Sequence, residues 1–152
     1  MVGMKAKIVF QTTNGNNRAI AERFRKNLVV LGHDVSMHNV YDVLPEELVG
    51  ADLYVFTAPT HMQRAPRRIR SFLKKLAKSG WEVRYALVAT RLPGSKGDHE
   101  PRTLDMMASS FTGPGHVRMG GLFIDSKTMK GPLESGWEAK VDAFLADILS
   151  RL

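Results

Sequence analysis

The sequence predicts an α/β domain: a doubly wound, five-stranded parallel sheet of order 2-1-3-4-5 in a three-layer α-β-α arrangement. Two observations predict it. Short apolar runs alternate along the chain with segments whose apolar residues recur at helical spacing. Such alternation is typical of a parallel sheet covered by helices on both faces. The 152 residues are a usual length for one domain, so we treat residues 1–152 as a single domain.

Five strands and four helices follow in chain order. Strands are expected at residues 7–10, 33–40, 51–58, 83–90 and 117–124. The third is almost wholly apolar, as in a strand buried on both faces, whereas the pair Gly120-Gly121 weakens the fifth because glycine destabilises a strand interior. Helices are expected at residues 16–31, 64–78, 99–111 and 134–152. The first has apolar residues on one face and Gly32 as its C-terminal cap.

Composition excludes several classes of function. There are no cysteines, so disulfides, cysteine-ligated metals and cysteine nucleophiles are excluded. The five histidines show no pair at metal-ligand spacing, so we expect no metal site. The first residues do not form a secretory leader, and no apolar run is long enough to span a membrane. We therefore expect a cytoplasmic protein.

The loop at residues 12–17 is the first candidate site. In doubly wound sheets, ligands bind beyond the carboxyl ends of the strands, where the strand order reverses. This loop joins the first strand to the first helix, and it is rich in hydroxyl and amide groups: Thr12, Thr13, Asn14, Gly15, Asn16 and Asn17. Unpaired N–H groups at a helix start favour a phosphate. The alternative is structural, with Thr12 and Asn14 forming a turn and Asn16 or Asn17 capping the helix.

Two motifs resemble those of the flavodoxin family. Thr12, Gly15 and Asn16 match its phosphate-binding signature T-x-[ST]-G-N-[ST], while Asn14 and Asn17 replace hydroxyl residues. Residues 58–61 and 63–66 resemble the family's run S-P-T-Y-G-G-x-x-P. The resemblance covers residues 5–152 and suggests a short-chain member.

The resemblance implies that the chain binds flavin mononucleotide (FMN). Residues 12–17 would surround the 5′-phosphate, and two loops would flank the flavin ring. These loops contribute Pro59, Thr60, His61 and Met62 on one side, and Thr90, Arg91, Leu92 and Gly94 on the other. In such a protein the flavin carries the redox chemistry, while the chain orients it and tunes its potential.

Two features depart from the family. Neither flanking loop holds a Trp, Tyr or Phe to stack on the ring, so His61 and Leu92 take those places. The chain is also basic, with a net charge of +7, whereas flavodoxin electron carriers are typically acidic. The predicted helix at residues 64–78 has no acid and seven bases: Arg64, Arg67, Arg68, Arg70, Lys74, Lys75 and Lys78.

The basic helix has a structural and a functional interpretation. It is either a solvated face or a docking face for an acidic partner or for the phosphates of NADPH. Interleaved aromatics and a nucleic-acid-binding motif are both missing, which argues against nucleic acid as the partner.

Two hypotheses follow for the function. The first is an FMN-binding redox protein, either an electron carrier for a partner protein or a small reductase that uses NAD(P)H. The alternative is an interaction module of the same fold, without tightly bound flavin, that docks acidic partners through residues 64–78. Whether the chain is an enzyme stays open at this point, and no catalytic residue is assigned.

Overall fold

The computed structural model describes residues 3–93 and 100–152. All five strands of its sheet run parallel, in the order β2-β1-β3-β4-β5, which confirms the predicted topology. The strands are β1 (Lys5–Phe10), β2 (Asp34–Asn39), β3 (Leu53–Pro59), β4 (Val83–Arg91) and β5 (His116–Asp125). The order reverses between β1 and β3, so the connections that leave their carboxyl ends lead to helices on opposite faces of the sheet and leave room for a ligand between them.

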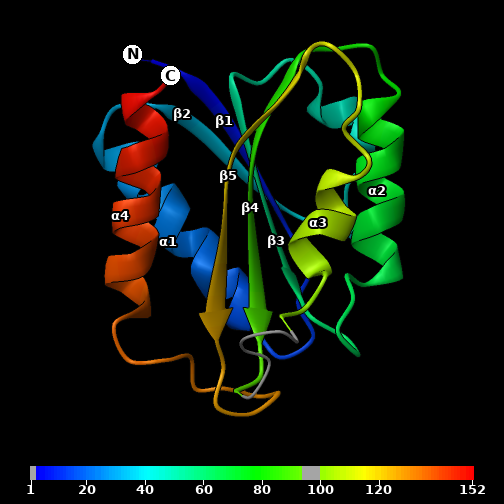
Figure 1. Cartoon of the computed structure of the whole chain (residues 1–152). Coiled ribbons are helices and arrows are strands. Elements are labelled where there is room, and N and C mark those ends of the chain that lie inside the picture. Colours follow the sequence, from blue (N-terminus) through cyan, green and yellow to red (C-terminus); the bar gives the residue numbers. More distant parts are fainter. Residues whose placement is uncertain (1–2, 94–99) are drawn as a thin grey trace.

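Helices cover both faces of the sheet (Figure 1). One side holds α1 (Asn16–Val30) and α4 (Trp137–Ser150), and the other holds α2 (Arg67–Ala77), α3 (Thr103–Ala108) and the 3₁₀ turn η1 (Pro45–Leu48). Each layer has its own apolar core. Phe24 of α1 and Val141 of α4 are buried against one face, and Phe72 of α2 and Met107 of α3 against the other. The helices are thereby fixed on the sheet by burial of apolar area, the main stabilising contribution in folding.

Three helices differ from their predicted extents for local reasons. α2 begins at Arg67 because Pro66 precedes it as the N-cap and disfavours helical geometry at Ala65. α4 begins at Trp137, after Gly136 with φ 80°. α3 has only six residues and ends at Ala108; its predicted start at His99 lies outside the described residues. The 3₁₀ turn η1 was not predicted from the sequence.

The glycine pair in β5 makes room for neighbouring side chains. A Cβ at Gly120 would lie 2.9 Å from Cε1 of Phe144 on α4, and one at Gly121 would lie 2.7 Å from Nη2 of Arg118. β5 nevertheless pairs with β4 along its whole length, with one register shift at Tyr85/Ala86. The predicted strand therefore forms, and its glycines let side chains pack close to the backbone.

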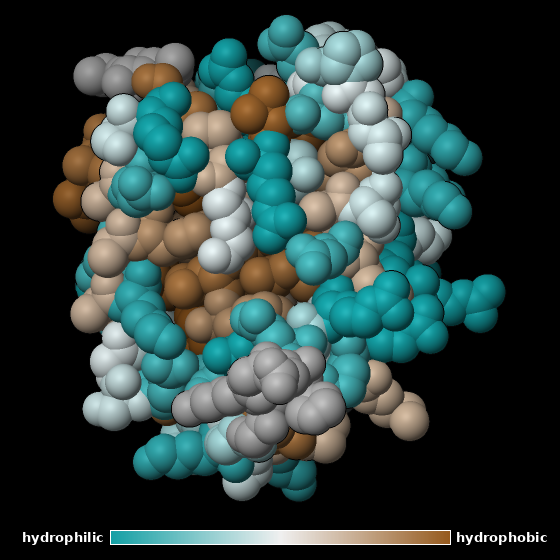
Figure 2. Space-filling model, in the orientation of Figure 1, coloured by the Kyte–Doolittle hydropathy of each residue, from teal (hydrophilic) through white to brown (hydrophobic). Residues whose placement is uncertain are grey.

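Apolar surface remains visible along β5 between the helices of the two layers (Figure 2). β5 lies at the edge of the sheet, and its Leu122 and Phe123 are only half-buried. Within residues 3–93 and 100–152, no helix has the length and apolar character needed to cross a membrane.

Candidate functional site

A cleft of about 480 Å³ lies at the carboxyl ends of the strands. Loops after β1, β3, β4 and β5 form it, and they meet at the lower end of the sheet in Figure 1. Most of the predicted site residues line it: Thr12, Thr13, Asn14, Asn16, Asn17, Pro59, Thr60, His61, Met62, Thr90, Arg91 and Leu92. Gly15 lies in the first loop, and Gly94 is outside the described residues. The volume of the cleft is within the usual range for small-molecule sites.

The loop between β1 and α1 presents unpaired donors. The N-cap of α1 is Gly15, with φ 89° and no side-chain capping bond, so neither Asn16 nor Asn17 is the cap. Oγ1 of Thr12 accepts the Gly15 N–H at 2.8 Å, as the structural interpretation expects, and its own hydrogen can still donate. The N–H groups of Asn16, Asn17 and Arg18 make no hydrogen bond to a described residue. Such a turn can bind an anion at the positive end of α1.

The segment after β5 holds this loop in place from the far end of the chain. Nδ2 of Asn14 donates to the carbonyl of Met129 at 3.0 Å, and Nδ2 of Asn16 donates to Oγ of Ser126 at 3.4 Å. Ser126, Thr128 and Met129 also line the cleft, and the sequence analysis missed all three. The polar run directly after the fifth strand could have identified them by the same rule that located the other loops.

Asn17 has an unsatisfied acceptor in the cleft wall. Its Nδ2 donates to Oγ1 of Thr90 at 3.1 Å, and its backbone carbonyl accepts from Oγ1 of Thr57 at 3.2 Å. Its Oδ1 is buried and has no partner among the described residues. Buried polar atoms are nearly always hydrogen-bonded, so a hydroxyl or N–H of a bound ligand suits this position.

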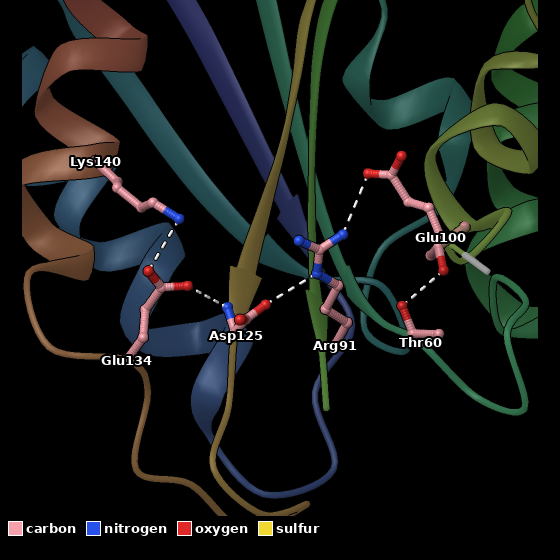
Figure 3. A network of polar contacts seen from close by, with 7 residues as sticks. Thr60, Arg91, Glu100, Asp125, Glu134 and Lys140 are labelled. Carbon is pink, nitrogen blue, oxygen red and sulfur yellow. Dashed lines mark hydrogen bonds and ion pairs between the residues drawn. The ribbon is translucent and has the colours of Figure 1, made fainter. Parts of the chain in front are cut away.

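Arg91, the last residue of β4, lies between the carboxylates of Asp125, the last residue of β5, and Glu100 (Figure 3). Its Nε donates to Oδ1 of Asp125 at 2.9 Å and its Nη1 to Oε1 of Glu100 at 3.2 Å, while its guanidinium lies 4.5 Å from the centre of the Phe123 ring. Glu134 accepts the backbone N–H of Asp125 and pairs with Lys140 at 2.9 Å. This network fixes the β4 and β5 ends of the cleft, so Arg91 serves as a wall rather than as a free cation.

The loop after β3 makes a tight two-residue turn at the cleft mouth. His61 and Arg64 exchange both backbone hydrogen bonds, at 2.9 and 3.0 Å. Met62 and Gln63 between them have φ of 51° and 68°, a region that favours glycine. Met62 is 94% exposed. Arg64 therefore belongs to this turn and not to the helix that the sequence predicted.

The chemistry of the cleft fits a neutral or anionic ligand with an apolar part. Among its described lining residues there is no carboxylate and no Trp, Tyr or Phe. Exposed apolar side chains at its mouth come from Met62, Leu92 and Met129. In residues 3–93 and 100–152 no group of three His, Cys, Asp or Glu could hold a metal ion.

Comparisons with known proteins identify the fold. No family profile matches the sequence, and neither does any curated protein. Among solved structures, the chain is similar to a flavodoxin of Streptococcus pneumoniae, with a TM-score of 0.77 and 20% identity over 97% of this chain and 99% of the other. It is also similar to flavodoxin 1 of Bacillus cereus, with a TM-score of 0.78 and 15% identity over 97% and 99% of the two chains.

A flavodoxin variant of Fusobacterium nucleatum bound to flavin mononucleotide matches with a TM-score of 0.72. It is 14% identical over 99% of this chain and 98% of the other. The class of protein is therefore clear at the level of fold: the chain is flavodoxin-like, as the motif resemblance predicted.

Proposed function

We propose that this chain binds FMN in the cleft and transfers electrons through it. The observation that supports this most directly is the start of α1, where three backbone N–H groups lack a described partner beside a cleft whose described lining residues include no carboxylate. Residues 12–17 hold the 5′-phosphate there. Pro59, Thr60, His61 and Met62 flank the ring on one side. Thr90, Arg91 and Leu92 flank it on the other.

The chain's own residues bind and orient the cofactor. The dipole of α1 and its free N–H groups stabilise the phosphate charge. Oδ1 of Asn17 accepts a hydrogen bond from the ligand, which satisfies a buried acceptor. The flavin, when bound, supplies the redox chemistry. Side chains of His61 and Leu92 cover less of the ring than aromatic side chains would, so we expect FMN to bind several-fold more weakly than to an aromatic-lined site.

The proposal is tested by the visible absorption spectrum of the purified protein, before and after addition of FMN. Flavin bands near ~450 and ~375 nm that stay with the protein through gel filtration are expected. Asn16→Glu should abolish retention, since it places a carboxylate beside the phosphate. Lys26→Gln changes the net charge by the same amount near the far end of α1 and should retain FMN. Equal retention by both variants would reject the assignment of residues 12–17.

An electron carrier and a reductase are distinguished by their electron donor. A small reductase would accept hydride from NAD(P)H, so NADPH added without air should bleach the flavin bands. A carrier would keep its bands with NADPH alone and lose them only when a reduced partner protein is added. We favour the carrier, because the exposed cleft mouth at Met62 suits contact with another protein.

A second candidate function is an interaction module without tightly bound flavin. The missing aromatic side chains in the cleft favour it, as does the basic surface of α2, which would dock acidic partners. A colourless protein that does not retain added FMN would support this second function against the first.

A further inference from the structure

A second cavity of about 700 Å³ lies next to the cleft, at the start of α2. We call it the arginine groove, because Arg64, Arg67, Arg68 and Arg70 line it together with Tyr41 and Gln11. No Asp or Glu is among its described lining residues. None of its four arginines forms an ion pair with a residue in the described part of the chain. The groove therefore concentrates positive charge that nothing in the described fold neutralises.

The walls of the groove are held by hydrogen bonds. Gln11 is buried at the end of β1, where its Oε1 accepts the N–H of Ile69 at 2.9 Å and its Nε2 donates to the hydroxyl of Tyr41 at 3.2 Å. The Arg68 guanidinium lies 5.1 Å from the centre of the Tyr41 ring, and Nε of Arg70 donates to the carbonyl of Ala65 at 3.1 Å. Two of the four guanidinium groups are thus positioned before any ligand arrives, which lowers the entropy cost of binding.

The groove and the cleft are neighbours. His61 and Met62 line both cavities, so the turn after β3 is their shared wall. A partner molecule that binds the arginines would also contact the exposed Met62 and cover the mouth of the cleft. Docking in the groove and electron transfer at the cleft would therefore use adjacent surfaces.

The basic surface continues beyond the groove. α2 has no acid, and its last turns add Lys74, Lys75 and, just after it, Lys78. In Figure 2 hydrophilic side chains project along the α2 side of the molecule, at the right of the view. An 11-residue helix is about 16 Å long, so the basic surface is larger than a single phosphate or carboxylate requires. This extent favours the surface of another protein over a small anion.

We propose that the arginine groove docks an acidic surface of a redox partner protein and brings it against the cleft mouth. This inference rests on the proposed function, and it places the contacts that orient the partner at Arg64, Arg67 and Arg68, while the lysines further along the basic surface add long-range attraction. Guanidinium groups match carboxylates in a planar, two-bond geometry that lysine lacks. Long-range attraction to the remaining lysines would speed the encounter, and the arginines would set the orientation.

The test uses a fluorescein-labelled peptide of consecutive glutamates as the probe, with binding followed by fluorescence anisotropy at low salt. One triple variant carries Arg64→Gln, Arg67→Gln and Arg68→Gln. Its charge-matched control carries Lys74→Gln, Lys75→Gln and Lys78→Gln. An exposed ion pair contributes a factor of about two to five in affinity. The arginine variant should therefore bind about tenfold or more weakly, and the lysine variant no more than about threefold more weakly.

Two results would overturn the proposal. Equal weakening by both triple variants would mean that α2 attracts acids without a defined site. Inorganic pyrophosphate is the second probe: if it binds more tightly than the peptide and depends on the same arginines, the groove is a small-anion subsite instead. The visible absorption of each sample distinguishes failure of FMN binding in the cleft from failure of docking in the arginine groove. Peptide binding by colourless protein would reject the proposed function alone, whereas flavin retention without peptide binding would reject only the docking site.

Discussion

Oε1 of Gln11, the residue after β1, accepts a hydrogen bond from the backbone N–H of Ile69 in the first turn of α2, at 2.9 Å. Gln11 is 4% exposed, so this side chain satisfies a buried donor that the helix cannot satisfy itself. The contact joins the carboxyl end of a central strand to the helix that carries most of the arginine groove. It therefore positions the groove relative to the cleft.

Gln11→Leu should lower the free energy of unfolding by about 1–3 kcal/mol, because it leaves the Ile69 N–H buried without an acceptor. The measurement is urea unfolding followed by circular dichroism. Tyr41→Phe is the control: it removes the longer, partly buried bond from Nε2 of Gln11 at 3.2 Å and keeps the bond to Ile69, so it should lower stability by less than Gln11→Leu does. Similar losses in both variants would contradict a dominant role for the Ile69 bond.

The fold could be predicted because its pattern is local. β3 is apolar because helices cover both of its faces, and α1 has apolar residues at helical spacing because one side of it packs on the sheet. The alternation of strands and helices then leaves few possible topologies. The ends of α2 and α3 were less predictable. Where α2 begins depends on Pro66 and on the turn from His61 to Arg64, which periodicity does not reveal.

The cleft was predictable for the same reason, up to its last loop. The loops after β1, β3 and β4 were found because ligands of doubly wound sheets bind beyond the carboxyl ends of the strands where the strand order reverses, and because two of their motifs resemble those of flavodoxins. Ser126, Thr128 and Met129 were missed because the rule was applied only to the strands next to the switch point, although these residues also follow a strand end; their contacts with Asn14 and Asn16, more than 100 positions away in sequence, hold the two loops together. The arginine groove was visible only as a basic helix, since its depth depends on Tyr41 and Gln11.

Leu92→Tyr should tighten FMN binding by about two- to tenfold. An aromatic ring beside the flavin contributes about 0.5–1.5 kcal/mol beyond the area it buries, and Leu92 lies partly exposed at the cleft mouth. Quenching of FMN fluorescence measures the affinity. Leu44→Tyr is the matched control, because Leu44 is similarly exposed and lines neither cavity. Unchanged affinity in the Leu92 variant would place the ring elsewhere.

Met62→Val should lower the free energy of unfolding by about 1 kcal/mol, because a β-branched residue is strained at φ 51°. Met62→Asn should leave stability nearly unchanged, since asparagine tolerates this region. Met129→Val makes the same chemical change at another exposed methionine without positive φ. Thermal unfolding of the three variants gives the comparison, and equal effects at both methionines would show that the turn at Met62 is not strained.

The stability of the protein should fall as the pH decreases below about 6.5. Burial, aided by repulsion from Lys7 and opposed by Glu47, lowers the pKa of His38 from its usual 6.5. The unfolded chain therefore takes up a proton before the folded one does, so the contribution of His38 is complete above pH 6.5 and is lost as the pH falls through the folded pKa. His38 also lies 2.8 Å from Oγ of Ser36.

His38→Gln should remove this part of the pH dependence. Urea unfolding of both proteins at about pH 7.5 and about pH 5.5 measures it. The original chain should lose more stability over this interval than the variant. An equal loss would assign the acid sensitivity to groups other than His38.

The contacts of Asn14 with Met129 and of Asn16 with Ser126 also bear on the order in which the protein is made. During synthesis the first loop leaves the ribosome early, but the segment that holds it is more than 100 residues behind. At about 5–20 residues per second, the loop waits several seconds before the cleft can be completed. A nascent chain released before β5 would therefore carry residues 12–17 without the segment that completes the cleft.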